Sequence, residues 1–96
     1  MVSLRGSILL VDDEEKILKA LGRALRDDGH DVVDTSSALD AQRLLSERSF
    51  DVFVVDNVMP EKNGLDLIRE YVASTSEGER AQILMMTAHA TVESAI

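Results

Sequence analysis

The chain has 96 residues, of which 45% are hydrophobic and 29% are charged, and its formal net charge is −8. This length fits one domain spanning residues 1–96, and the composition is that of a soluble globular protein. The acidic balance argues against direct nucleic-acid binding by this domain, because no basic stripe is present to meet phosphates. The absence of cysteine excludes disulfides and thiolate metal sites. No apolar run approaches the roughly 20 residues that span a bilayer, and no secretory pattern is seen, so we expect a cytoplasmic location and no membrane contact.

The first part of the chain alternates a continuous apolar run with helical periodicity. Residues 7–11 form an apolar run that predicts a strand buried on both faces, as in a parallel sheet. A helix follows and stops at Gly29, and residues 31–35 predict a second strand. The apolar residues at helical spacing in this first helix are Ile17, Leu21, Ala24 and Leu25.

The middle of the chain repeats this alternation. Ser36 or Ser37 can cap a second helix that extends through residues 38–45. Residues 50–55 predict a third strand that ends in Asp56, and a loop follows. The apolar residues that mark a third helix are Leu65, Ile68, Tyr71 and Val72.

The last part of the chain adds one more strand and the start of a helix. Residues 82–86 predict a fourth strand that ends at Thr87, with Met85 and Met86 in the core, and a fourth helix begins near Thr91. Strict alternation of strands and helices implies an α/β fold, with a parallel sheet, right-handed crossovers and helices on both faces.

Polar side chains follow three of the four predicted strands. Asp12 and Asp13 come directly after the first strand, Asp56 follows the third and Thr87 follows the fourth. In an open parallel sheet the ligand site lies beyond the carboxyl ends of the strands. The pattern therefore predicts that three carboxylates and one hydroxyl share one edge of the sheet.

Three neighbouring carboxylates repel one another, since two unit charges about 5 Å apart cost roughly 3 kcal/mol at an effective dielectric near 20. Either one carboxyl is protonated or a cation lies among them. Hard oxygen ligands favour Mg²⁺, and a carboxylate beside Mg²⁺ can attack phosphorus to form an acyl phosphate. Each residue alone also has an ordinary structural explanation. Asp12 and Asp13 can cap a helix, Asp56 can be a turn residue and Thr87 can be a strand-end residue.

At this point the sequence resembles the receiver domains of bacterial two-component response regulators. The segments that carry the resemblance are residues 8–14, residues 51–56, Met59 and Pro60 with Gly64, and residues 86–88. The run 86–96 is most similar to receivers of sigma-54-dependent AAA+ transcription activators. The resemblance covers nearly the whole chain and implies a flavodoxin-like, doubly wound parallel sheet with strand order 2-1-3-4.

The resemblance implies a role for each residue at the sheet edge. Asp56 would accept a phosphoryl group from the phosphohistidine of a sensor histidine kinase. Asp13 would bind Mg²⁺ directly, Asp12 would do so directly or through water, and the backbone carbonyl of Val58 would complete the protein ligands. Thr87 would contact the phosphoryl group and couple it to the fourth helix, as a two-state switch that controls an output, which we expect to be transcription.

The chain departs from the family pattern at its C-terminal end. The family has a lysine at the end of a fifth strand, beyond Thr87, whereas this chain has only Lys16, Lys19 and Lys62. We expect a chain cut short before the fifth strand and helix, with a C-terminal AAA+ or DNA-binding output domain in the full-length protein. An uncovered fourth strand predicts self-association. The absent lysine predicts weak or absent phosphorylation by small phosphodonors.

Three functions are open on the sequence alone. The first is a signalling receiver, which is not an enzyme because its phosphorylation is stoichiometric. The second is a phosphorylation-inert interaction or dimerisation module with the same fold. The third is a phosphatase with an aspartate nucleophile, which would want a second acid where this chain has Val58.

Overall fold

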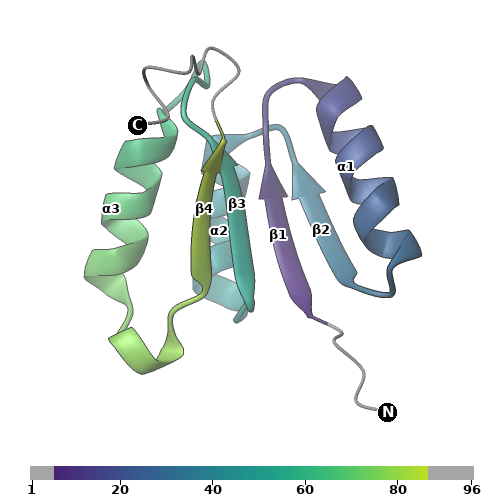
Figure 1. The fold of residues 1–96 in the computed structure, drawn as a ribbon. Helices are drawn as coiled ribbons and strands as arrows, with labels where there is room; N and C mark the ends of the chain where they lie inside the picture. Colours follow the sequence, from purple (N-terminus) through teal and green to yellow (C-terminus); the bar gives the residue numbers. More distant parts are fainter. Residues whose placement is uncertain (1–5, 87–96) are drawn as a thin grey trace, which may run out of the picture.

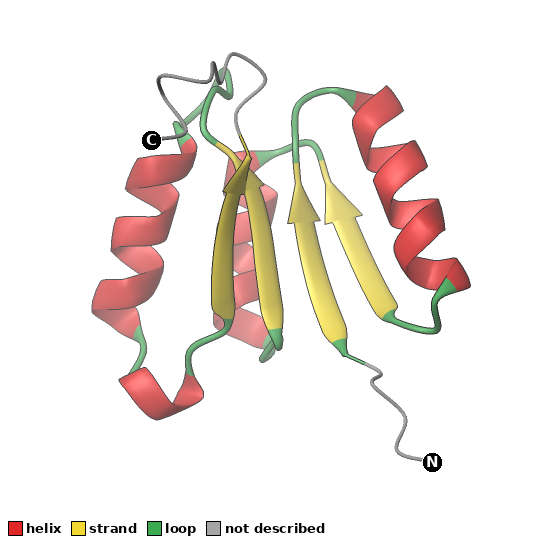
Figure 2. Cartoon of the chain, in the orientation of Figure 1, coloured by secondary structure: helices red, strands yellow, loops and turns green. Residues whose placement is uncertain are grey.

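The computed structural model describes residues 6–86, in which a parallel sheet is flanked by helices (Figures 1 and 2). Strands and helices alternate along the chain, as the sequence predicts. The elements are β1 (Ser7–Val11), α1 (Glu15–Asp27), β2 (Asp31–Thr35), α2 (Ala38–Glu47), β3 (Val52–Asp56), α3 (Gly64–Ser74), the 3-10 turn η1 (Glu77–Glu79) and β4 (Gln82–Met86). The predicted helix near Thr91 lies outside the described residues.

The four strands are all parallel and lie in the order β2-β1-β3-β4, which confirms the predicted topology. Helix α1 covers one face of the sheet, whereas α2 and α3 lie on the other (Figure 1). No helix among residues 6–86 is both long and apolar enough to cross a membrane.

The continuous apolar character of β1 and β3 is explained by burial on both faces. Successive strand side chains point to opposite faces of a sheet. Leu9 and Phe53 accordingly lie in the core under α2 and α3, whereas Leu10 and Val54 lie in the core under α1. Two apolar layers therefore fix these strands in register, and their carboxyl ends meet at one edge.

The buried faces of two helices differ from the predicted ones. In α1 the buried positions are Leu18 and Gly22, while Ala24 is exposed. In α3 they are Gly64, Leu67 and Tyr71, whereas Leu65 and Val72, two of the apolar residues that marked the predicted helix, are 41% and 36% exposed. The reason in α3 is that Gly64 packs against the end of β3, which turns the residues one and two turns later toward the sheet.

Strand β4 has the predicted bounds but not the predicted burial. Met86 packs against the core under α1, whereas the prediction for Met85 was wrong, since that residue is 41% exposed. Leu84 is 54% exposed. Within residues 6–86, β4 pairs with β3 on one side only and forms an edge of the sheet.

Candidate metal centre

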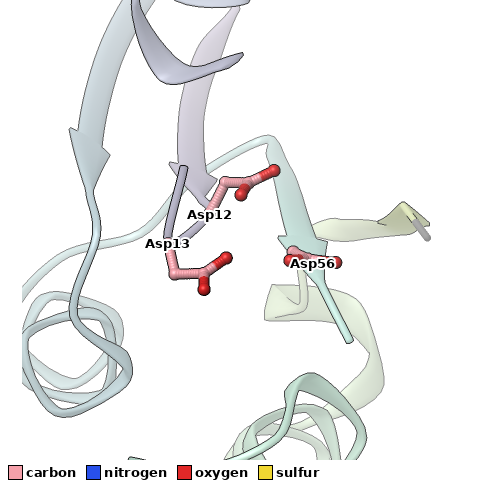
Figure 3. A group of neighbouring side chains, drawn as sticks. All are labelled: Asp12, Asp13 and Asp56. Carbon is pink, nitrogen blue, oxygen red and sulfur yellow. The ribbon is translucent and has the colours of Figure 1, made fainter. Parts of the chain in front are cut away.

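Three carboxylates converge at the carboxyl ends of β1 and β3 (Figure 3). Asp12, Asp13 and Asp56 each contribute one oxygen to a group whose atoms all lie within 4.8 Å of one another. Asp12 and Asp56 are only 3% and 7% exposed, while Asp13 faces solvent. The structure thus brings together the three acidic residues that the sequence analysis grouped at this edge.

Strand register explains why Asp12 and Asp56 meet. Val11 of β1 lies opposite Val55 of β3, so the next residue of each strand projects from the same edge. The Asp12 amide donates to the carbonyl of Thr35 at 3.3 Å, which continues the pairing with β2 by one residue. One Asp12 carboxylate oxygen accepts from the Glu14 amide at 2.9 Å and supports the turn into α1. Asp12 therefore has the ordinary helix-entry role and also faces the other two carboxylates.

Gly64 determines how closely α3 approaches Asp56. A Cβ atom at this position would overlap the backbone carbonyl oxygen of Asp56 and would lie 3.0 Å from the Cα of Asn57. The Gly64 amide also donates to the Asn57 carbonyl at 2.9 Å. The third strand extends to Asp56 itself, one residue further than predicted. The backbone at Asp56 therefore pairs with β4 and is also packed against Gly64 of α3.

The electrostatics of the site favour a bound cation. Burial is the main cause that raises the pKa of Asp56, and the charges of Asp12 and Asp13 raise it further, while the Val58 amide partly opposes them. A carboxylate that is both desolvated and repelled gains from a nearby positive charge. The donor set consists of carboxylate oxygens, which suits a hard divalent cation such as Mg²⁺. The residues present therefore fit the metal that the sequence analysis expected.

The loop between β3 and α3 holds the remaining candidate ligand. Val58 is 58% exposed, and its amide lies 3.5 Å from an Asp56 carboxylate oxygen. Met59 anchors the loop in the core, where it is 7% exposed. Lys62 forms an ion pair with Glu70 of α3. Thr87, the predicted phosphoryl contact, lies outside the described residues.

Sequence reasoning missed the polar residues that support this loop. The Asn57 side-chain oxygen accepts from the Leu65 amide at 3.3 Å, and the Ser37 hydroxyl donates to a Glu61 carboxylate oxygen at 3.1 Å. Asn57 lies just after the strand, where a short polar side chain commonly bonds nearby backbone, so this contact had a weak local signal. The Ser37–Glu61 contact joins two loops that are far apart in sequence, so no local sequence signal indicated it.

Comparison with known proteins gives a family match over most of the chain. The response regulator receiver domain family matches residues 8–96. The alginate biosynthesis transcriptional regulatory protein AlgB of Pseudomonas aeruginosa is 36% identical over 92 residues, which cover 96% of this chain and 20% of that protein. The chain thus spans about a fifth of the length of this curated relative. Such relatives agree with the predicted likeness to receivers of sigma-54-dependent activators.

Two solved structures share the fold; one contains a phosphorylated aspartic acid and a calcium ion, and the other is a complex with a histidine kinase. A response regulator protein from Burkholderia pseudomallei with a phosphorylated aspartic acid, a calcium ion and citrate is 27% identical, with a TM-score of 0.76, over 92% of this chain and 50% of that one. The complex of the histidine kinase ThkA with the response regulator protein TrrA matches with 26% identity and a TM-score of 0.79, over 92% of this chain and 72% of that one.

Proposed function

We infer, because this chain belongs to the response regulator receiver domain family, that Asp56 accepts a phosphoryl group from the phosphohistidine of a sensor histidine kinase in a Mg²⁺-dependent reaction. The observation that carries this proposal is the convergence of Asp12, Asp13 and Asp56 within 4.8 Å. The phosphorylated aspartic acid of the Burkholderia relative and the kinase complex of TrrA support it by analogy.

The proposed step is a direct transfer of the phosphoryl group from the imidazole of the kinase to the carboxylate of Asp56. A carboxylate oxygen of Asp56 forms a bond to phosphorus while the bond from phosphorus to the imidazole nitrogen breaks, and the nitrogen keeps the electron pair. Asp13, Asp12, Asp56 and the Val58 carbonyl would hold Mg²⁺, and the Thr87 hydroxyl would contact the phosphoryl oxygens. Bound Mg²⁺ supplies positive charge that offsets repulsion between carboxylates and phosphoryl oxygens.

The chain's own contribution to this step is positioning. Asp56 is 7% exposed and has α3 packed against its backbone, so its carboxylate has little freedom to move away from the other two. The Glu14 amide donates a hydrogen bond of 2.9 Å to one carboxylate oxygen of Asp12 and so restricts the position of that side chain. Holding the reacting groups in place before transfer lowers the entropy lost in the transition state.

The proposed output is a change of conformation rather than turnover. Phosphorylation replaces the single negative charge of the Asp56 carboxylate with a phosphoryl group of about two negative charges, and this can bias an equilibrium between two conformations. AlgB is a transcriptional regulatory protein about five times longer than this chain, so we propose transcription control through an output domain of the full-length protein. A cytoplasmic location suits exchange with a kinase.

A phosphorylation assay tests this function. The chain is incubated with a small acyl phosphate, with and without Mg²⁺, and the mass of the intact protein is measured. We expect a Mg²⁺-dependent gain of one phosphoryl group, which is lost in Asp56→Asn. Asp66→Asn is the matched control, because Asp66 is an exposed aspartate of α3. Equal uptake by Asp56→Asn would refute the assignment.

The same assay addresses the second candidate function. The second candidate is a phosphorylation-inert interaction or dimerisation module with the same fold. Such a module would show neither Mg²⁺ binding nor phosphoryl uptake while it keeps the same fold.

A further inference from the structure

A path of hydrogen bonds joins the two sides of the metal centre outside the carboxylates themselves. On one side, the Asp12 amide donates to the Thr35 carbonyl at 3.3 Å. The Thr35 hydroxyl oxygen then accepts from the Ser37 amide at 3.1 Å. On the other side, the Ser37 hydroxyl donates to a Glu61 carboxylate oxygen at 3.1 Å, and Glu61 belongs to the loop that follows Asp56. The path thus runs from the end of β1, through the turn after β2, to the loop after β3.

The Ser37–Glu61 bond has no substitute within the loop. The other polar contacts of residues 57–63 lead to β3, β4 or α3, through the Val58 amide, the Asn57 amide and side chain, and the Lys62–Glu70 ion pair. Among residues 6–86, Ser37–Glu61 is the only hydrogen bond from this loop to residues that precede β3. It is therefore the one polar contact that ties the loop to the Asp12 side of the site.

Ser37 is suited to this role because its hydroxyl already has a fixed position. It is the N-cap of α2, where its oxygen accepts from the Asp40 amide at 3.2 Å. Because the hydroxyl oxygen accepts this hydrogen bond, the hydroxyl proton points away from the Asp40 amide. It forms a hydrogen bond to a Glu61 carboxylate oxygen. A carboxylate beside a helix N-terminus is also favoured by the helix dipole. The two loops are thus held in one relative position by a contact of defined geometry.

We propose that Ser37 and Glu61 are positioning residues for the metal centre, because their hydrogen bond holds the Val58-bearing loop in place relative to Asp12. The inference rests on the proposed function, in which Val58 and Asp12 bind the same Mg²⁺ ion. Neither residue touches the ion. Their effect is on its affinity, through the distance between the two groups of ligands. Groups that orient metal ligands typically change metal affinity by about 10–100-fold when they are removed.

Mg²⁺ titration of four single variants and one double variant tests the proposal. By isothermal titration calorimetry, we expect Glu61→Ala to weaken Mg²⁺ binding about tenfold, although the substitution removes a negative charge that would itself attract the ion. Glu61→Gln keeps the accepting oxygen and is expected to bind within about twofold of the unsubstituted chain. Glu47→Ala is the charge-matched control, since Glu47 is an exposed carboxylate at the far end of α2. The fourth variant, Ser37→Ala, completes a double-mutant cycle with Glu61→Ala, and in its background the loss of Glu61 should have no further effect.

A second measurement separates positioning from general stability. Without metal, amide hydrogen exchange at Val58 and Met59 should be faster in Glu61→Ala than in Glu61→Gln. The urea midpoint should move little, because exposed polar pairs contribute only about 0–1 kcal/mol. Equal Mg²⁺ affinity in Glu61→Ala and the unsubstituted chain would overturn this inference alone. Failure of the unsubstituted chain to bind Mg²⁺ would overturn the proposed function as well.

Discussion

Asp56 is held in surroundings that oppose its own charge. The carboxylate is 7% exposed, and burial together with Asp12 and Asp13 raises its pKa. In the range between the ordinary and the raised pKa, the folded protein binds more protons than the unfolded one, so stability falls as pH rises. The buried Asp56 carboxyl thus destabilises the metal-free protein at pH values above its ordinary pKa, and protonation or a cation reduces the effect.

Asp56→Asn should therefore stabilise the metal-free protein. We expect a gain of about 1–2 kcal/mol in the free energy of unfolding at neutral pH, because one of three mutually repelling charges is removed. The gain should shrink as pH falls through the raised pKa of Asp56 and should vanish below the ordinary carboxyl value. Urea unfolding in a chelator, across this pH range, measures it. Mg²⁺ should stabilise the unsubstituted chain more than the variant, and a gain independent of pH would contradict this explanation.

Gly64 is the second residue on which the site depends. An added Cβ would overlap the Asp56 carbonyl oxygen, which is backbone and cannot move aside cheaply. We expect Gly64→Ala to lower the free energy of unfolding by about 1–3 kcal/mol, as overpacking does, and to weaken Mg²⁺ binding. Gly78→Ala is the matched control, since nothing lies within 4 Å of the atom it would add. Equal denaturation midpoints for the two variants would show that α3 can retreat freely.

At the scale of elements, strands were predicted better than helix faces. The ranges 31–35 and 82–86 match β2 and β4, because a short apolar run between polar turns leaves little choice of bounds. The face of α3 could not be read from periodicity alone, since Leu65 and Leu67 are both apolar. Contact between Gly64 and Asp56 selects Leu67, and that contact exists only in the folded chain.

The same distinction applies to the site. The acidic residues at the ends of β1 and β3 could be grouped from sequence, because parallel strands bring their carboxyl ends to one edge. The Ser37–Glu61 bond could not, since it depends on how two loops fold over that edge. The local sequence pattern thus predicts which site residues lie at the ends of strands. The contacts between loops depend on tertiary packing and cannot be predicted in this way.

The C-terminal end of α3 depends on a side chain from outside the helix. The Arg80 guanidinium donates to the carbonyls of Val72 at 3.2 Å and Thr75 at 2.9 Å, which the helix itself leaves unpaired. We expect Arg80→Ala to lower the free energy of unfolding by about 1–2 kcal/mol. Arg69→Ala, on the exposed side of the same helix, should change it by less than about 0.5 kcal/mol. Urea unfolding distinguishes them, and equal effects would mean that the cap contributes nothing.

At the scale of the whole molecule, the two edges of the sheet differ in charge. The β2 edge carries Asp31 and Asp34, which form ion pairs with Arg48 and Arg26. Strand β4 has no charged residue, and Leu84 is 54% exposed. Charged side chains protect sheet edges from pairing with other chains, so of the two edge strands within residues 6–86 it is β2 that has this protection. With a net charge of −8, two copies repel each other over most of their surface, and an uncharged edge is where they can approach.

We therefore expect the 96-residue chain to self-associate through β4. Sedimentation velocity should show a concentration-dependent dimer, and Leu84→Lys should abolish it by placing a charge on the edge. Leu39→Lys is the matched control, because Leu39 is similarly exposed, at 57%, but lies on α2. Since added salt screens the repulsion between acidic copies, it should strengthen the dimer of the unsubstituted chain and of Leu39→Lys. A monomer at high concentration and high salt would show that the β4 edge is closed to a second copy.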